Sequence, residues 1–172
     1  MLVGVAAVGK TTLGTGVAAD IGMSFADVDL TMENRLGVTI AEMIDEKKWD
    51  DERINALLWR TFYDLMNSKE QLLIAATPRL MDQKDFWSLC RGRAVTIHLR
   101  WEPGKVLRRE EALKRGISEK EVVLTAKMKA DYSNYYWWRL GHCKKSEREL
   151  RLTGDLETDL ARLVALIRAE TG

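Results

Sequence analysis

A glycine-rich segment at the start of the chain constrains the fold more than any other feature. Residues 4–11 read Gly-Val-Ala-Ala-Val-Gly-Lys-Thr and match the pattern G-x-x-x-x-G-K-[ST] at every fixed position. In this pattern, backbone N–H groups cradle phosphate, the lysine reaches the β- and γ-phosphates, and the hydroxyl ligates Mg²⁺. The segment therefore predicts a P-loop, with Lys10 as the phosphate lysine and Thr11 as the metal ligand.

The surroundings of this loop agree with the prediction. A P-loop follows a strand and opens a helix, and residues 10–21 carry apolar side chains at helical spacing before a stop at Gly22. Only residues 1–3 precede the loop, so either the first strand is short or the natural start lies upstream. A chance glycine-rich turn is the competing interpretation, and the Lys-Thr pair and the helix disfavour it. The expected nucleotide-binding residues are Gly4, Ala7, Val8, Gly9, Lys10, Thr11 and Thr12.

Length and charge limit the classes of protein that the chain can belong to. The 172 residues predict one domain with one core, and a net charge of +1 gives no general attraction to nucleic acid or membrane. The sequence contains no apolar run of about 18 residues, so we expect no membrane-spanning helix. Cys90 and Cys143 are too few and too far apart for a disulfide framework or zinc site. We expect a cytoplasmic protein with reduced thiols, either a monomer or a weak dimer.

Short apolar runs alternate with helical patterns, which predicts an α/β fold with a five-stranded parallel sheet flanked by helices. Pro78 and Pro103 each follow an expected strand, where the ligand loops of such sheets lie. The expected strands are residues 1–5, 24–28, 71–76, 94–99 and 149–152. The expected helices are residues 10–21, 31–36, 39–47, 50–67, 82–91, 103–115, 118–139 and 155–170.

Two further features bear on chemistry. Asp27 and Asp29, at positions i and i+2 of the second expected strand, would share one face beside the P-loop. Asp27 would hold Mg²⁺ through water and Asp29 would orient an acceptor hydroxyl; the alternative is a pair of helix-capping aspartates near Thr31.

Residues 105–139 are rich in Lys and Arg and end in an aromatic run. They predict either solvated helices or a lid that covers the phosphates.

The stretches Gly9-Lys-Thr-Thr-Leu-Gly14, Phe25-Ala-Asp-Val-Asp29 and Gly37-Val-Thr-Ile-Ala-Glu-Met43 together resemble shikimate kinase, without an obvious gap over residues 2–54. The resemblance implies a P-loop kinase, a three-layer sandwich with a helical lid, in which residues 1–172 form a single domain. Residues 105–130 would be the lid and residues 31–67 the acceptor-binding segment. ATP would be the co-substrate and Mg²⁺ the cofactor.

The resemblance also implies residue roles. Lys10, Thr11 and Asp27 match the phosphate lysine and the metal shell, and Asp29 matches the aspartate that binds the ring hydroxyls of shikimate. Arg53 falls where the family has an arginine for the substrate carboxylate, although a surface arginine is the competing interpretation.

Three departures fall on the acceptor side and the lid. Thr77, Pro78 and Arg79 replace three family glycines, and the Arg-Pro pair of the family lid is absent. The family has a second substrate arginine four residues before a tyrosine. When Tyr132 is aligned with that tyrosine, Met128 takes the position of the arginine, and Lys127 and Lys129 flank it. Arg109, Lys114 or Arg115 would replace the lid arginine. The expected catalytic residues are Lys10, Asp29, Arg109 and Arg115, and the expected acceptor residues are Asp29, Arg53, Thr77, Pro78, Arg79, Lys127 and Lys129.

Three functions fit these features. The first is a shikimate kinase or a close homologue that phosphorylates a small carboxylated acceptor. The second is a related small-molecule or nucleoside monophosphate kinase, because residues 115–120 and 131–136 look like lid and post-lid segments of cytidylate-kinase-like proteins and Arg79 suits a phosphate-bearing acceptor. The third is a regulatory nucleotide-binding module that has lost phosphoryl transfer.

Overall fold

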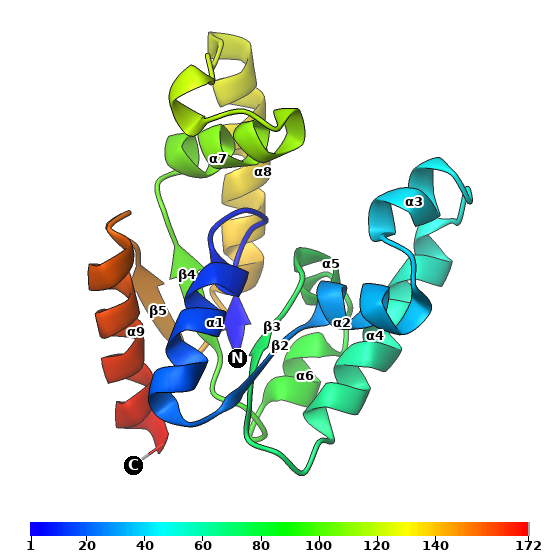
Figure 1. The fold of residues 1–172 in the computed structure, drawn as a ribbon, viewed down its shortest axis with the longest axis vertical. Helices are drawn as coiled ribbons and strands as arrows, with labels where there is room; N and C mark the ends of the chain where they lie inside the picture. The colour runs from blue at the N-terminus through cyan, green and yellow to red at the C-terminus, as the bar shows by residue number, and fades with distance from the viewer. Residues whose placement is uncertain (172) are drawn as a thin grey trace.

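Five short parallel strands form the centre of the molecule, in the order β2-β3-β1-β4-β5 (Figure 1). In this computed structural model, which describes residues 1–171, every strand pair is parallel. The prediction of a five-stranded parallel sheet is therefore confirmed. The strands are β1 (Leu2–Val3), β2 (Ser24–Asp27), β3 (Leu72–Ala75), β4 (Ile97–Arg100) and β5 (Arg148–Arg151).

Helices cover both faces of the sheet and create two cores. Successive side chains of a strand point to opposite faces, so Leu2 packs in one core and Val3 in the other. The first core lies under α1 (Lys10–Ile21) and α9 (Leu156–Thr171). The second lies under α2 (Val28–Leu36), α3 (Ile40–Asp45), α4 (Asp51–Met66), α5 (Pro78–Met81) and α6 (Phe86–Cys90).

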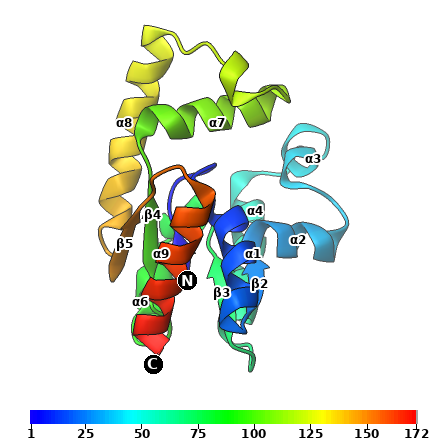
Figure 2. The same cartoon turned by 60° about the vertical axis from the view of Figure 1, so that its left-hand side comes forward.

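The remaining helices rise beyond the carboxyl edge of the sheet. Helix α7 (Pro103–Arg115) crosses above the P-loop and contacts both η1 (Glu119–Glu121), a short 3-10 helix, and α8 (Ala126–Cys143) (Figure 2). Helix α8 runs from this raised part down to the sheet, where Tyr136 joins the first core and Cys143 the second. The expected lid segment therefore stands above the strand ends that carry the P-loop.

Two expected helices were wrong in their extent. A single helix over residues 118–139 is replaced by η1 and α8, and α8 begins where the Thr125 hydroxyl accepts a hydrogen bond from the Met128 amide at 3.2 Å. The expected helix over residues 82–91 is shortened to α6, and a separate short helix, α5, precedes it and begins at Pro78, a residue that suits a first helical position.

The packing of α1 on the sheet depends on Gly14. A β-carbon at this position would lie 2.1 Å from Cε2 of Phe25 on β2. We expect Gly14→Ala to lower the free energy of unfolding by about 1–3 kcal/mol, because the phenyl ring must leave its place in the core. Gly104→Ala in α7 is the control: its β-carbon meets no atom within 4 Å, so better helix propensity should leave stability equal or higher. Equal denaturation midpoints for Gly14→Ala and the wild type would contradict the expectation.

Candidate active site

The P-loop connects β1 to α1 in a conformation that its glycines allow. Gly4 and Gly9 have φ angles of 150° and 107°, a region that side chains disfavour. A β-carbon on Gly4 would also lie 2.8 Å from the carbonyl oxygen of Leu99 on β4. Gly9 is the N-cap of α1, so the positive end of this helix faces the loop. The loop and the helix end together form an anion site.

Lys10 is held inside the loop. Its residue exposure is only 9%, and its Nζ donates hydrogen bonds to the carbonyl oxygens of Gly4 at 3.0 Å and Val5 at 2.8 Å. Burial lowers the pKa of the Lys10 ammonium to about 8, although the carboxylates of Asp29 and Asp27 oppose this shift. These two hydrogen bonds place the Lys10 ammonium inside the P-loop, where it would contact a bound phosphate.

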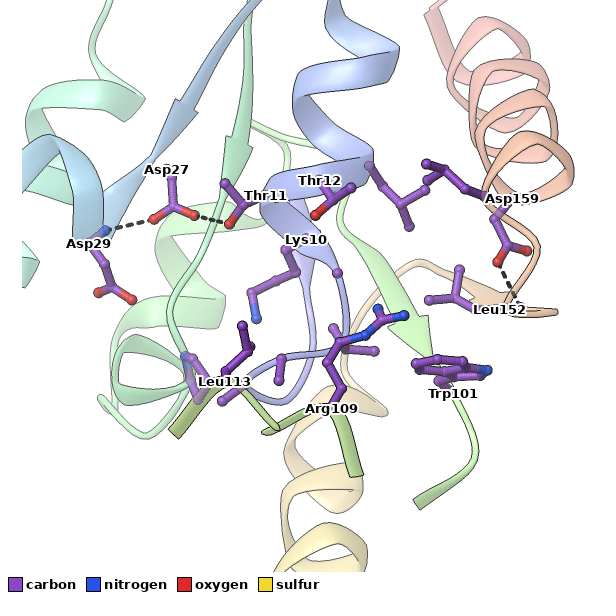
Figure 3. A pocket seen from close by; sticks show the side chains of 18 residues that line it. Lys10, Thr11, Thr12, Asp27, Asp29, Trp101, Arg109, Leu113, Leu152 and Asp159 are labelled. Carbon is purple, nitrogen blue, oxygen red and sulfur yellow. Dashed lines mark hydrogen bonds between the residues drawn. The ribbon is translucent and has the colours of Figure 1, made fainter. Parts of the chain in front are cut away.

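Asp27 links the P-loop to the next helix (Figure 3). Its Oδ2 accepts a hydrogen bond from Thr11 Oγ1 at 2.6 Å, and its Oδ1 accepts from the backbone N–H groups of Asp29 at 3.0 Å and Leu30 at 3.4 Å. Asp27 is thus the N-cap of α2 and also a neighbour of the P-loop hydroxyl. Because this cap starts the helix at Val28, the expectation of a helix beginning at residue 31 was wrong.

Asp29 does not lie on the strand. The expectation that Asp27 and Asp29 share one strand face was wrong, because Asp29 lies in the first turn of α2. It still borders the cavity that holds the P-loop. Burial and then the charge of Asp27 raise the pKa of the Asp29 carboxyl to about 6, opposed by the Thr77 hydroxyl and Lys10. Its Oδ1 is buried and has no hydrogen-bond partner among residues 1–171, so it is free to accept a hydrogen bond from a ligand.

One cavity of about 590 Å³ connects these groups. Asp27 and Asp29 lie at one end, the P-loop borders the middle, and Trp101 and Leu152 lie at the other end (Figure 3). The cavity thus has Asp27 and Asp29 at one end and Trp101, Leu152 and Asp159 at the other, with the anion site between them. It is lined by Ala6, Ala7, Val8, Gly9, Lys10, Thr11, Thr12, Leu13, Asp27, Asp29, Pro78, Trp101, Arg109, Leu113, Leu152, Gly154, Leu156 and Asp159.

The donor set beside the P-loop fits Mg²⁺. This ion takes oxygen ligands and usually combines one or two protein groups with substrate phosphates and water. The Thr11 hydroxyl and the Asp27 carboxylate already lie within 2.6 Å of each other at the mouth of the phosphate cradle. Both residues line the cavity, so an ion between them would face a bound phosphate.

Arg109 is the expected lid cation that reaches the cavity. Its guanidinium lies over the Trp101 ring at 4.3 Å, and its Nε donates to Glu119 of η1 at 2.9 Å. Its Nη1 would lie 3.5 Å from a β-carbon built on Gly9, so this side chain lies beside the P-loop. Arg115 does not line the cavity; it is exposed and pairs with Glu111 at 2.9 Å.

Only some of the expected acceptor residues lie at the cavity. Thr77 is buried and Pro78 lines the cavity beside Asp29. Arg53 is exposed and its guanidinium lies over the Trp49 ring at 3.8 Å, while Arg79 pairs with Asp51 at 2.7 Å. Neither arginine borders the cavity. Lys127 and Lys129 are exposed on α8 and also lie outside the cavity lining.

A different arginine lies beside Pro78. Arg139 on α8 is only 8% exposed, and its Nη1 donates to the carbonyl oxygen of Pro78 at 3.0 Å and to the carboxylate of Asp82. Its Nε donates to Tyr135 Oη at 3.3 Å, and its guanidinium lies over the Trp138 ring at 4.7 Å. Its charge is close enough to depress the pKa of Lys10. Arg139 is therefore a buried cation that contacts Pro78, a residue of the cavity wall, while it lies outside the cavity lining itself.

Residues 6–150 match the family model described as shikimate kinase. The chain belongs to the shikimate kinase family. It is 38% identical over 53 residues to shikimate kinase 2 of Yersinia pestis (strain Pestoides F), a match that covers 31% of this chain and 30% of that protein. It is 32% identical over 76 residues to the pentafunctional AROM polypeptide of Schizosaccharomyces japonicus, covering 44% of this chain and 5% of that polypeptide. These matches thus span less than a third of either relative.

Solved shikimate kinases share the fold. The enzyme from Bacteroides thetaiotaomicron superposes with a TM-score of 0.79 at 19% identity, covering 97% of this chain and 96% of that one. The enzyme from Acinetobacter baumannii, solved in complex with shikimate, gives a TM-score of 0.78 at 17% identity, with 98% and 92% coverage. The expected P-loop kinase fold is thus confirmed.

Within residues 1–171, no helix is both long and apolar enough to cross a membrane.

The sequence analysis gave Arg139 no role, although the residue directly follows the aromatic run of residues 132–138. Anchoring the family pattern on Tyr132 put Met128 at the position of the substrate arginine, but Met128 lies near the start of α8, far along the helix from Pro78. Because α8 continues to Cys143, its lower half brings Arg139 to the loop after β3.

Proposed function

We propose that this protein is an ATP-dependent phosphotransferase that transfers the γ-phosphoryl group of ATP to a hydroxyl of a small carboxylated acceptor, with shikimate as the first candidate. The observation that carries the proposal is the buried, unpartnered oxygen of Asp29 in one cavity with Lys10 and the Thr11–Asp27 pair. Membership of the shikimate kinase family supports the reaction, and a similar fold solved with shikimate supports the acceptor.

On the donor side, phosphoryl transfer requires positioning and charge neutralisation more than covalent chemistry. The backbone N–H groups of the P-loop and the N-terminus of α1 would hold the phosphates. Lys10 would exchange its hydrogen bonds to Gly4 and Val5 for the β- and γ-phosphates. Mg²⁺, bound beside Thr11 and Asp27, would offset negative charge on the phosphates. Arg109 would add a lid cation by leaving Trp101, with residues 105–130 as the lid.

On the acceptor side, Asp29 would accept a hydrogen bond from the reacting hydroxyl and orient it for attack in line with the leaving group. A pKa of about 6 leaves this carboxyl ionised at neutral pH, so it is available as an acceptor and as a weak base. Arg139 would hold the acceptor carboxylate, because its Nη2 makes no hydrogen bond among residues 1–171. Residues 31–67, with Arg53, would close the other side of the acceptor.

The competing functions differ in acceptor and activity. A monophosphate acceptor is favoured by Arg79, but that arginine is already paired with Asp51. A regulatory module is suggested by the Thr77-Pro78-Arg79 segment and by the missing Arg-Pro pair, while Lys10, Thr11, Asp27 and Asp29 are all present. The buried free thiols of Cys90 and Cys143 agree with our proposal of a cytoplasmic protein.

A coupled assay of ADP release tests the proposal. The protein is incubated with ATP and Mg²⁺ and with shikimate, gluconate or cytidine monophosphate in turn. We expect acceptor-dependent ADP release with shikimate. Turnover with the monophosphate alone would instead support the second function. Tight ATP binding without turnover of any acceptor would support the regulatory module.

A further inference from the structure

Helix α7 turns one cation and one apolar side chain toward the cavity. Arg109 and Leu113 both line it, and because they are four residues apart in one helix, they lie on the same face, about 6 Å apart along the axis. The residues that α7 buries are Val106, Leu107 and Ala112. Leu113 therefore faces the cavity and does not belong to the packed side of the helix.

Leu113 adds exposed apolar surface to the cavity. The residue is 70% exposed, so much of its side chain is available for contact with a bound molecule. Among residues 1–171, Leu156 is the one other large, exposed apolar residue that lines the cavity. Leu156 begins α9 just after Gly154, which packs on the Trp101 ring. The two exposed leucines thus come from different walls of the cavity.

The course of α7 carries Leu113 toward Asp29. The helix begins at Pro103, close to Trp101, and crosses above the P-loop (Figure 2). Leu113 lies ten residues beyond Pro103, about 15 Å further along the helix. In the view of Figure 3, Leu113 is on the side of Lys10 and Asp29, whereas Arg109 is toward Trp101. The apolar side chain of the lid is thus directed to the part of the cavity where the proposed transfer takes place.

Phosphoryl transfer at this place has a competing reaction. In transfer, the acceptor oxygen bonds to the γ-phosphorus, the bond from this phosphorus to the β,γ-bridging oxygen breaks, and the hydroxyl proton passes to Asp29. Water can attack in the same way, which gives ADP and inorganic phosphate. A carboxylate accepts a hydrogen bond from water as well as from an acceptor hydroxyl, so Asp29 does not distinguish the two. An apolar group beside the γ-phosphate does, because it offers water no hydrogen bond.

We propose that Leu113 is a specificity-determining residue that keeps water from the γ-phosphate and so favours the acceptor over hydrolysis. This inference rests on the proposed function, because it takes Asp29 as the acceptor base and residues 105–130 as the lid. When the lid covers the substrates, Leu113 closes the cavity over the reacting groups, and Pro78 is an apolar part of the wall beside Asp29. Arg109, one turn earlier, supplies the positive charge on the same helix face.

The test measures inorganic phosphate and ADP in one reaction with ATP, Mg²⁺ and saturating shikimate. Transfer releases ADP alone, whereas hydrolysis releases ADP and inorganic phosphate in equal amounts. We expect Leu113→Ala to raise the ratio of inorganic phosphate to ADP by about five- to tenfold, because water reaches the γ-phosphate. Alanine preserves the helix propensity of α7. Leu113→Met should keep the wild-type ratio, because methionine is apolar and similar in volume.

Two controls match this variant. Leu156→Ala removes the other exposed leucine of the cavity, and Val123→Ala removes a 77% exposed apolar side chain of the lid that lies outside the cavity lining. Both variants should keep the wild-type ratio. An equal rise in the Val123 variant would overturn the inference, because the effect would then belong to the lid as a whole.

Thermal unfolding establishes that each variant is folded. If Leu113→Ala is not, Leu113→Gln carries the same expectation, because glutamine favours a helix as leucine does and brings a polar group. A wild type that phosphorylates shikimate, together with a folded Leu113 variant of unchanged ratio, would overturn this inference alone. If the wild type does not phosphorylate shikimate, the proposed function is wrong and the role of Leu113 is rejected with it.

Discussion

Lys10→Ala is expected to abolish nearly all phosphoryl transfer, lowering kcat by about a thousandfold or more, as loss of a group that stabilises transition-state charge does. The ammonium is buried in the P-loop and held by the carbonyl oxygens of Gly4 and Val5. No other lysine lines the cavity, as far as the structure describes it, so no side chain of the same kind can replace the lost charge. Steady-state ADP release with saturating ATP measures the effect.

Two controls accompany this variant. Lys69→Ala removes an exposed lysine from the turn before β3 and should keep the rate of the wild type. Circular dichroism should show that the Lys10 variant is folded, because α1 keeps its Gly9 N-cap and its buried apolar residues. A Lys10→Ala protein with more than a tenth of the wild-type kcat would disprove the assigned role of this residue.

Asp29→Asn is expected to lower kcat by about a hundredfold to ten-thousandfold, the range for a lost general base, while the affinity for ATP stays the same. The amide keeps the shape of the carboxyl group but cannot accept the proton of the acceptor hydroxyl. Asp29 contacts neither the P-loop hydroxyl nor the lid arginine by a hydrogen bond, so nucleotide binding should not depend on it. ATP titration calorimetry and the ADP-release assay together separate binding from transfer; unchanged rates would mean that the acceptor lies elsewhere.

The same variant should change the pH dependence of stability. The folded-state pKa of Asp29 is raised from 3.8 to about 6 by burial first and by Asp27 second. The folded protein therefore binds this proton more tightly than the unfolded chain, and Asp29 lowers stability as pH rises from about 4 to about 6. Asp29→Asn removes this effect and should raise the free energy of unfolding at pH 7.5 by about 1–3 kcal/mol. The difference should disappear below pH 4, and urea denaturation at both pH values measures it.

For the wild-type protein, the raised pKa of Asp29 predicts that activity falls at acid pH. Acceptor turnover should fall as pH drops through about 6, because the protonated Asp29 no longer accepts a hydrogen bond. Above pH 8 the free protein loses the charge of Lys10, whose pKa burial lowers to about 8, so kcat/KM for ATP should fall there. A profile that is flat from pH 5 to 9 would contradict both assignments.

Local patterns were enough to locate the residues of the proposed donor side. Lys10, Thr11 and Asp27 lie where the sequence pattern indicated, and the Thr11–Asp27 hydrogen bond brings together residues that the sequence separates by one helix. The parallel sheet followed from the alternation of apolar runs and helices. The observed strand limits differ from the expected ones by up to three residues; β4, for example, begins at Ile97 and not at residue 94. The reason is that a strand extends as far as it pairs with its neighbours, whereas the prediction followed the apolar residues.

Other features required contacts that no local pattern contains. Asp29 changed from strand to helix because the side chain of Asp27 caps α2. Arg53 and Arg79 carry the charge expected of acceptor ligands, yet Trp49 and Asp51 hold them outside the cavity lining. Arg109, among several lid cations, reaches the P-loop because α7 crosses above it and Trp101 supports the guanidinium.

By itself, the sequence determined a candidate phosphate cradle over residues 4–11, because backbone amides, a lysine and a hydroxyl within one short segment supply all of its groups. Only the tertiary structure decided how the acceptor side is built. Pro78, which lines the cavity, meets the buried Arg139 across 61 positions of sequence, and Asp82 meets the same guanidinium across 57. Such a pairing depends on the length of α8 and its packing against the loop after β3, and both are set by the folded core.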